Sequence, residues 1–337
     1  MINFEKFNLQ QKAAISLIQN DLRFIYTIIA NITNIKSNYI VSAMPLIGTI
    51  IDGTEDWLKA YNNSSRNKID IPLFTKEEQE YYENMRSAIK FWDDTYSAIN
   101  EKIKQLYIDS DKYFSSLCAP IARVLKLYDI FGVDIADNQF CGNTILCNSY
   151  VPDFSYGTNN EEQIKQLSKI CGKYVAMFDA TMPYRVNNSI KFTCSDFGGF
   201  VKSPIGNQYG DKFVIFCLLC QVNFILICIE KYIAEECSTK LRFAYLQYYY
   251  ISKLLPELNS ELHSNFKMDT TWVSEQFRNA MAHYKIGIAL KSNEIIPDDY
   301  FMGLTQKYFS CDYITLKNNI MLNISNIADQ MKIYLGI

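Results

Sequence analysis

Histidine is scarce in this chain: 337 residues contain only His263 and His283. The sequence also lacks a cysteine and histidine cluster with metal-ligand spacing, a glycine-rich phosphate loop, a serine–histidine arrangement and a paired-carboxylate site. The common motifs for metal binding, phosphate binding by a glycine-rich loop and hydrolysis are therefore absent. The net charge is only −3, from 33 basic and 36 acidic residues. Broad electrostatic adhesion to nucleic acid is therefore excluded, whereas a local basic cleft is compatible with the composition.

Hydrophobic residues make up 49% of the chain, and aromatic residues 14%, which predicts a sizeable buried core in one large or two medium domains. The ten cysteines are dispersed, and we expect no signal peptide, so reduced thiols in the cytoplasm are the expectation. Cys217 and Cys220 form a Cys-x-x-Cys pair, but they lie in an apolar helical run without a second pair or a nearby histidine. We expect neither a metal nor another cofactor.

Only one long hydrophobic run is present, from Phe213 to Ile229. Its seventeen residues are at the short edge for a bilayer crossing, and Gln221 and Asn223 lie near its middle. The pattern favours a central bundle helix over a transmembrane helix, with Gln221 or Asn223 directed at a partner or at a site.

Helical periodicity dominates the N-terminal part. A continuous apolar stripe predicts a bundle helix over residues 8–36, with Asp21 and other polar residues on the remaining faces. A capping box of Thr75 and Glu78 then precedes a second stripe that lasts about three heptads. This stripe predicts one long helix, packed either on the first helix, the simpler choice, or on another subunit. Its members are Tyr82, Met85, Ile89, Trp92, Tyr96, Ile99, Ile103 and Leu106.

The intervening segments carry glycine and proline. Residues 38–60, with Pro45, Gly48 and Gly53, are interpreted as a broken helix or loop, and a surface loop follows as far as Pro72. A helix is predicted from Asp111 to Ile130, bent at Pro120 and stopped at Gly132. About thirty residues after Gly132 are predicted to be irregular. A helix is predicted over residues 160–182. Either short strands or an ordered loop is predicted over residues 183–211.

The C-terminal part is predicted to hold four helices. The second is expected to be capped by Ser238 and to run through Leu255; its tyrosines and basic residues suit either single-stranded RNA or core packing, and core packing is favoured. The last is predicted from Asp312 to Tyr334. The chain is thus expected to be all-α, with an N-terminal long-helix bundle (1–135) as a candidate regulatory part, a connecting region (136–205) and a C-terminal four-helix domain (206–337).

The third of these C-terminal helices contains His283. It is expected to be capped by Asp269 or Thr270 and to stop at Gly287. Asn279 and His283 lie four residues apart on one face, and the long side chain of Arg278 can converge on the imidazole. Histidine exchanges protons near neutral pH, arginine grips phosphate and stabilises developing charge, and asparagine orients a phosphate or hydroxyl.

A purely structural interpretation stands beside this one. Glu275 and Arg278 are three residues apart and can form a surface pair worth a few tenths of a kcal/mol. His283 would then be a C-terminal residue favoured by the helix dipole.

The string Arg278-Asn279-Ala280-Met281-Ala282-His283, on a helix in the C-terminal third of a helical protein, resembles the arginine, four residues, histidine signature of the HEPN superfamily. The resemblance covers at most about the last 130 residues and identifies no subfamily. It implies a four-helix or five-helix domain, often dimeric, and in many members a metal-independent ribonuclease of toxin, abortive-infection or antiviral systems.

Under this resemblance His283 is expected to act as general acid or base, Arg278 to stabilise the scissile phosphate and Asn279 to orient it. One histidine per chain does not easily serve as both acid and base, so we expect a homodimer through the C-terminal domain that brings two motif helices together. The expected partners are an RNA substrate and an antitoxin or regulatory partner, and no membrane. The alternative function is a non-catalytic helical module for protein or nucleotide binding.

Overall fold

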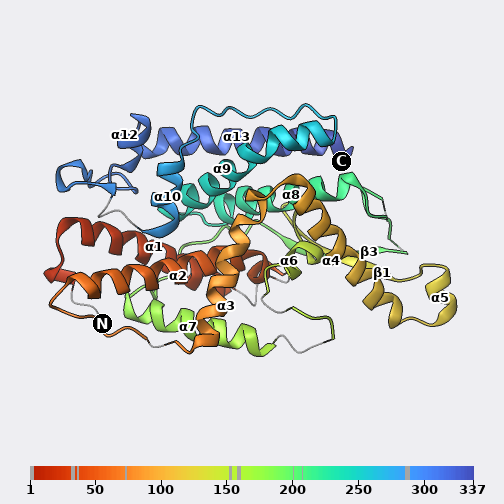
Figure 1. Cartoon of the computed structure of the whole chain (residues 1–337), viewed down its shortest axis with the longest axis horizontal. Helices are drawn as coiled ribbons and strands as arrows, with labels where there is room; N and C mark the ends of the chain where they lie inside the picture. Colours follow the sequence, from red (N-terminus) through yellow and green to blue (C-terminus); the bar gives the residue numbers. More distant parts are fainter. Residues whose placement is uncertain are drawn as a thin grey trace.

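The computed structural model describes residues 4–31, 35, 38–72, 74–151, 154–157, 161–199, 201–206, 208–284 and 289–337. Most of these residues are helical (Figure 1). The helices are α1 (Leu9–Asn31), α2 (Tyr39–Ser64), α3 (Lys76–Ser87), α4 (Tyr96–Ser116), α5 (Pro120–Val124), α6 (Thr144–Asn148), α7 (Glu161–Met177), α8 (Asp211–Asn223), α9 (Ser238–Glu261), α10 (Glu275–His283), α12 (Leu304–Phe309) and α13 (Tyr313–Leu335).

A small sheet interrupts the helices. Strands β1 (Asp129–Ala136), β2 (Gln139–Asn143) and β3 (Phe192–Gly198) form an antiparallel sheet in the order β2-β1-β3. The predominantly helical class is therefore confirmed, but the all-α description is wrong for this segment. The strand alternative for residues 183–211 is confirmed by β3.

The sheet also corrects the prediction of a helix over Asp111–Ile130. Helix α4 ends at Ser116, α5 is a separate short helix that begins at Pro120, and Gly132 lies inside β1 rather than at a helix end. Bulges in both ladders disturb the register of β1, so its buried positions do not alternate strictly and no clear two-residue period shows in the sequence.

Helix α1 follows its predicted stripe as far as the structure describes it: Ile15, Ile18, Leu22 and Ile25 are buried. Asp21, predicted on another face of the helix, is buried too, because Arg242 and Thr239 of α9 bind its carboxylate.

Helix α2 corrects the prediction of a broken helix or loop over residues 38–60. It continues for 26 residues with Pro45 inside, because burial along most of its length outweighs the lost hydrogen bond. The segment 65–72 is a loop as predicted, although residues 61–64, expected in this loop, belong to α2. The capping box of Thr75 and Glu78 is confirmed by both of its hydrogen bonds.

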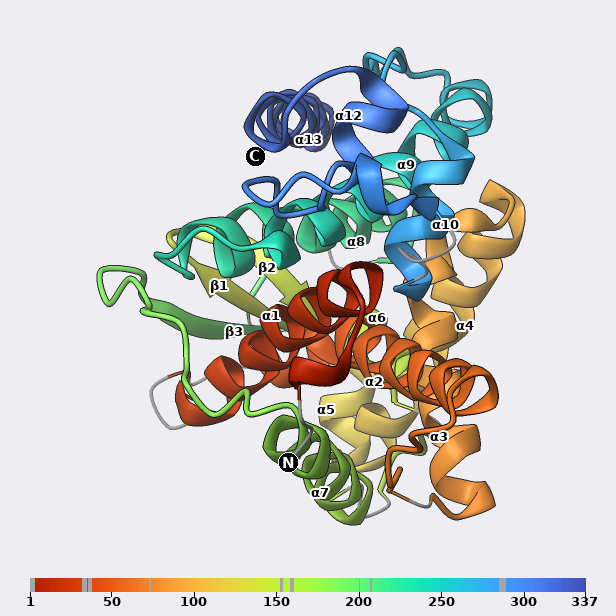
Figure 2. The same ribbon diagram turned by 90° about the vertical axis from the view of Figure 1, so that its left-hand side faces the viewer.

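The long helix predicted behind this capping box is broken. Helix α3 ends at Ser87, a 3₁₀ turn covers Ala88–Asp93, and α4 starts anew with Thr95 as its N-cap, whose hydroxyl accepts from Ala98 N at 3.3 Å. The stripe is nevertheless buried inside this chain from Tyr82 to Ile103, with Leu106 partly buried. Helix α3 packs on α2 and not on the first helix as expected (Figure 2).

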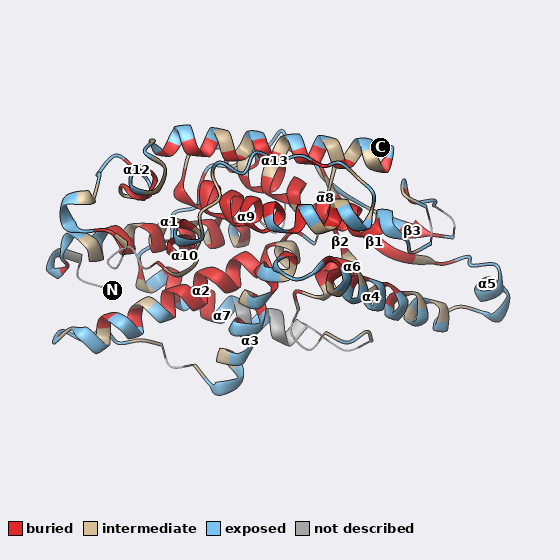
Figure 3. Cartoon of the chain, turned by 45° about the horizontal axis from the view of Figure 1, so that its top comes forward, coloured by how far each residue is buried: buried red, intermediate tan, exposed pale blue. Residues whose placement is uncertain are grey.

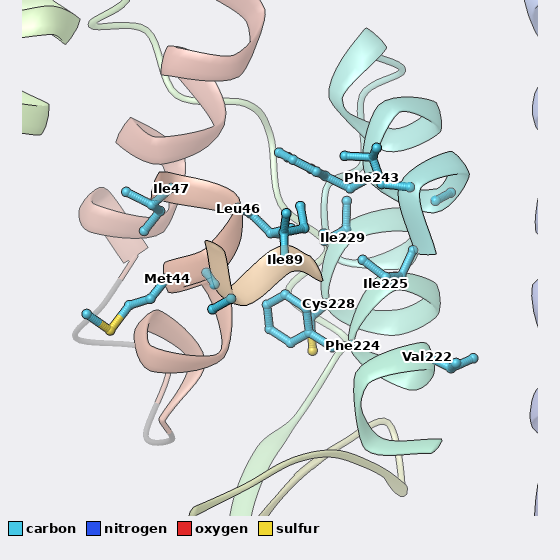
Figure 4. Packing of buried hydrophobic residues seen from close by; sticks show 14 of the residues in the cluster. Met44, Leu46, Ile47, Ile89, Val222, Phe224, Ile225, Cys228, Ile229 and Phe243 are labelled. Atoms are coloured by element: carbon cyan, nitrogen blue, oxygen red, sulfur yellow. The ribbon is translucent and has the colours of Figure 1, made fainter. Parts of the chain in front are cut away.

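Helices α8 and α9 lie at the centre, mostly buried (Figure 3). Helix α8 continues into a π-helical segment, Phe224–Lys231, and Leu46 of α2 and Ile89 of the 3₁₀ turn point toward it (Figure 4). By length and composition Asp211–Lys231 could cross a membrane, but 83% of its apolar window is buried inside the protein. This burial fits a helix at the centre of the protein core and agrees with the preferred sequence interpretation.

The two amides in this helix have partners within the chain. Gln221 Oε1 accepts from the Trp92 indole and, at 3.2 Å, from the Tyr150 hydroxyl. Asn223 Nδ2 donates to Phe140 O at 3.0 Å. Both amides therefore have structural partners, as one of the sequence alternatives predicted.

Other boundaries shift by several residues. Helix α7 ends at Met177 rather than Met182, and the predicted start at Asn160 lies outside the described residues. Helix α9 ends at Glu261 rather than Leu255, and its N-cap is Cys237, one residue before the predicted Ser238. The last helix is confirmed: Asp312 caps α13 by accepting from Thr315 N at 2.7 Å.

The C-terminal part contains α8, α9, α10 and α13 with the short α12 between the last two, and α10 crosses beside α2 (Figures 1 and 2). Helix α1 packs on α9 and α2 on α10. The N-terminal helices thus contact the motif helix directly. The three-part domain division and a HEPN bundle stay predictions.

Candidate functional site

Helix α10 begins where local hydrogen bonds fix it. Ser274 is the N-cap, with its hydroxyl accepting from Phe277 N at 3.2 Å, and its own N–H donates to the Tyr245 hydroxyl at 2.9 Å. The predicted cap at Asp269 or Thr270 was wrong, because Asp269 instead accepts from the amide and hydroxyl of Thr271 in a turn before the helix. The helix therefore starts later than the sequence suggested.

The buried face of α10 holds the helix on α9. Phe277, Ala280 and Met281 are buried, and the Phe277 ring meets Tyr245 edge-on with ring centroids 4.6 Å apart. Tyr284, with φ of 48°, ends the helix in the left-handed conformation. The predicted stop at Gly287 lies outside the described residues.

A buried polar cluster fixes the end of α10 beside His283. Arg242 of α9 forms an ion pair with Asp21 of α1 and donates to the Tyr284 hydroxyl at 2.6 Å and to Met281 O at 2.7 Å. Tyr284 donates to the same Asp21 carboxylate. The carboxylate and the tyrosine oxygen hold the pKa of Arg242 above its usual value despite its burial, which keeps the guanidinium charged. Three helices are thereby joined at the residue after His283.

His283 faces an arginine from a distant part of the chain. Arg86 Nη2 of α3 lies 2.7 Å from Nδ1 and 3.1 Å from Nε2 of the imidazole. Arg86 also forms an ion pair with the buried Asp52 of α2, and Asp56 Oδ2 lies 3.7 Å from Nη1. A guanidinium has only donors, so the ring nitrogen of His283 that takes part in this hydrogen bond is the acceptor.

Burial keeps the Asp52 carboxyl sensitive to its surroundings. Desolvation raises the pKa of Asp52, the Arg86 guanidinium opposes the rise, and the negative charge of Asp56 adds to it. The positive charge of Arg86 thus favours the ionised form of the Asp52 carboxyl.

Two glycines of α2 allow these elements to approach. A Cβ at Gly48 would lie 2.6 Å from Arg86 N and 2.7 Å from Met85 Cβ, and one at Gly53 would lie 3.0 Å from the Tyr284 ring. The sequence interpretation took both as breakers. They are contact points: Gly48 brings α3 against α2, and Gly53 brings the end of α10 against it.

Arg278 lies over a tyrosine rather than beside an acid. Its Cζ is 5.1 Å from the centroid of the Tyr249 ring of α9, and Lys253 Nζ is 4.8 Å from the same centroid. The described part of the chain has no ion pair between Arg278 and Glu275, the pair that the structural interpretation expected. The Nε of Arg278 is buried without a hydrogen-bond partner among the described residues. Such an unpaired donor calls for an acceptor.

The arginines of α3 and α10 share a neighbourhood at Tyr250. Burial raises the pKa of Tyr250 to about 12, the charges of Arg278 and Arg86 oppose the rise, and Asp93 adds to it. The hydrogen bond to Tyr249 raises the pKa of Lys253. Arg86, Arg278 and Lys253 thus gather near one tyrosine pair in a protein whose net charge is −3.

The structure places two of the three predicted site residues in the cluster and the third at the surface. His283 and Arg278 both lie in this cluster, but the arginine in contact with the imidazole is Arg86, which the sequence interpretation missed. Asn279 is exposed at the surface of α10. The tyrosines of α9 are buried, as the favoured core interpretation predicted, although Tyr249 also carries the two cations.

This arrangement has the parts for proton transfer and for anion binding. A neutral imidazole can accept a proton, and guanidinium and ammonium groups stabilise negative charge on phosphate oxygens. Comparisons with protein-family models, with curated proteins and with solved structures found no match. The HEPN resemblance therefore rests on the motif and its helical setting.

Proposed function

We propose that this protein is a metal-independent RNA endonuclease of HEPN type. His283 acts as general acid or base on the ribose 2′-hydroxyl or the leaving oxygen, Arg278 stabilises the charge on the scissile phosphate, and Asn279 orients it. The 2′-hydroxyl is the internal nucleophile, and the product carries a cyclic phosphate.

One observation carries the proposal: an imidazole at the end of α10 has an arginine within 3.1 Å, with a second arginine and a lysine gathered on the adjacent Tyr249. A cluster of this kind suits a phosphodiester, whose negative charge increases as the nucleophile attacks. We include Arg86 as a further cation of the site. Because Asp52 holds one side of its guanidinium, Arg86 can keep its place beside His283 while a phosphate oxygen approaches.

The proposal includes a homodimer through the C-terminal domain. A single His283 would have to serve as both acid and base, whereas two copies of α10 around one cleft supply two histidines. Light scattering should then give twice the 39.1 kDa mass of the chain. A monomer that cleaves RNA would refute the dimeric site while leaving the chemistry in place.

The catalytic test uses purified protein and RNA in excess EDTA. His283→Asn should slow cleavage by about 10² to 10⁴-fold, the usual range for loss of a general acid–base group. Arg278→Ala should slow it by about 10² to 10³-fold, the usual range for loss of a donor at a developing charge. DNA of the same sequence should stay intact because it lacks the 2′-hydroxyl. His263→Asn is the matched control, since His263 is the other histidine, is exposed and tolerates asparagine at its φ of 48°. Equal cleavage by all variants would assign the activity to another site or to a contaminant.

The second candidate is a non-catalytic helical module for protein or nucleotide binding. It is favoured by the contacts that His283 and Arg278 already make with Arg86 and Tyr249, which a merely structural cluster would also show. A growth assay separates the two functions. Toxicity on expression that His283→Asn relieves favours the nuclease, and toxicity that persists favours the binding module.

The biological role follows from the resemblance. We propose a cytoplasmic toxin or antiviral, abortive-infection effector, restrained by an antitoxin or regulatory partner. Co-expression with neighbouring genes would test this role: a neighbour that relieves growth arrest and co-purifies with the chain is the expected result.

A further inference from the structure

A second cluster of cations lies around a cavity of about 850 Å³. Its walls come from the N-terminal segment, the end of α2 with the loop behind it, and α7. None of its lining residues belongs to the cluster around His283. The lining includes Lys6, Arg66, Lys68 and Lys173.

The charge of this lining is strongly one-sided. Four cations face one carboxylate, that of Asp70, whereas the whole chain has more acidic than basic residues. Four like charges around one cavity repel one another, and an anion inside it relieves the repulsion. The lining therefore suits a ligand with several negative charges.

The same cavity has an aromatic surface. Phe7 and Tyr61 line it and are otherwise buried, with ring centroids 5.1 Å apart. Trp57 stacks on Tyr61 at 5.7 Å with planes 16° apart, which fixes the tyrosine ring. An aromatic surface beside cations suits a ligand that joins a flat ring to phosphates.

The loop that carries two of the cations is held in a defined shape. The Asn62 side chain donates to Ile69 O at 2.7 Å and accepts from Ile69 N at 2.8 Å, and these two hydrogen bonds hold the two ends of the loop together. Lys68 Nζ adds a third hydrogen bond by donating to the backbone oxygen of Asn62. These bonds anchor the loop, so the backbone positions of Arg66 and Lys68 at the cavity wall are defined.

We propose that this cavity binds a nucleoside polyphosphate. Its volume lies within the roughly 300 to 1,000 Å³ usual for small-molecule sites. Arg66, Lys68, Lys173 and Lys6 bind the phosphates, and the base lies against Phe7 and Tyr61. This site is independent of the proposed ribonuclease activity, and it gives the N-terminal region a ligand of its own.

The test is calorimetric titration of the full chain with ATP, tripolyphosphate and adenosine. ATP should bind most tightly, with an affinity that falls as salt is raised, because both the charge and the ring contribute. Tripolyphosphate that binds as well as ATP would refute the role of the aromatic surface, and adenosine that binds as well as ATP would refute the role of the cations.

The double variant Arg66→Glu with Lys173→Glu should weaken ATP binding by about tenfold or more, since two cations of the lining become anions that repel the phosphates. Both side chains are exposed, so the fold should survive. Lys202→Glu, an exposed lysine outside the cavity, is the matched control and should bind ATP as the parent does. No binding by the parent, or equal binding by the double variant, would overturn the proposal. Because binding is measured directly, the result stands whether or not the chain cleaves RNA.

Discussion

Arg86 and His283 are 197 positions apart in the chain, yet Arg86 Nη2 lies 2.7 Å from His283 Nδ1. The contact joins α3, in the predicted N-terminal bundle, to α10, in the predicted C-terminal domain. If His283 is the proton-transfer group of a ribonuclease, the N-terminal bundle is part of its site and not only a candidate regulator.

Arg86→Lys tests this contact. Lysine keeps the charge but has no planar fork with which to hold Asp52 and reach His283 at once. We expect RNA cleavage to fall by about 10²-fold, as for the loss of one donor at a developing charge, while the thermal midpoint changes little. Arg123→Lys, on the exposed helix α5, is the control and should cleave normally. Unchanged cleavage by Arg86→Lys would remove Arg86 from the site.

The sequence contains the motif residues but not their neighbours. Arg278, Asn279 and His283 lie on one short helix, so local spacing predicted that helix and its polar end, although not its N-cap at Ser274. The contact between Arg86 and His283 depends on how α3 crosses α2, and no spacing within either segment encodes it. Arg86 carries no local signal that distinguishes it from a solvent-exposed helical arginine.

The apolar periodicity likewise predicts which residues are buried better than it predicts whether the helix is continuous. The stripe from Tyr82 to Ile103 is buried, although the helix breaks between Ser87 and Tyr96. The break had a local signal, because Asp94 and Thr95 are good N-cap residues in the middle of the stripe. An apolar stripe continues through a 3₁₀ turn when the turn packs on the same core, so the stripe alone could not show the break.

Gly48→Ala tests the close approach of α2 and α3. Alanine is the better helix former, but here its Cβ would meet backbone at 2.6 Å, so α3 must move. We expect a loss of about 1 to 3 kcal/mol in the free energy of unfolding, typical of overpacking, measured by urea denaturation.

Gly172→Ala, in the exposed face of α7, is the control for this substitution. An added Cβ there meets no described atom within 4 Å. Helix propensity alone should then stabilise the protein by up to about 1 kcal/mol. If both alanine variants shift the unfolding free energy in the same direction, Gly48 is not a contact point.

Asp21→Asn tests the buried cluster that ends α10. It leaves the Arg242 guanidinium buried without its anion, although the position still accepts from Thr239. Breaking a buried pair from one side costs about 3 to 5 kcal/mol, and we expect a loss in that range by urea denaturation. Lys76→Ala, which removes an exposed pair with Glu80, should change the unfolding free energy by less than about 1 kcal/mol. Equal losses would mean that Arg242 finds other compensation.

Asp134 of β1 should make the protein less stable as the pH rises. Burial raises its pKa above the usual 3.8, although Asn38 N donates to Oδ1 at 3.0 Å, and Oδ2 is buried without a partner among the described residues. The folded state thus binds this proton more tightly than the unfolded state does. The stability that this group contributes is complete below about pH 3.8 and is lost as the pH rises through the raised value.

Asp134→Asn removes the buried charge while keeping an acceptor for Asn38. We therefore expect the variant to gain stability relative to the parent above pH 3.8, and its advantage to vanish in acid, as measured by thermal unfolding across pH. Asp94 is the control of opposite sign: its hydrogen bond from Lys102 lowers its pKa, so its contribution is present above about pH 3.8 and is lost as the pH falls. Asp94→Asn should accordingly lose a little stability near neutral pH. A parent and an Asp134→Asn variant with parallel pH profiles would show that the Asp134 carboxylate is solvated in the folded protein, because only a desolvated carboxylate makes the difference between the two profiles depend on pH.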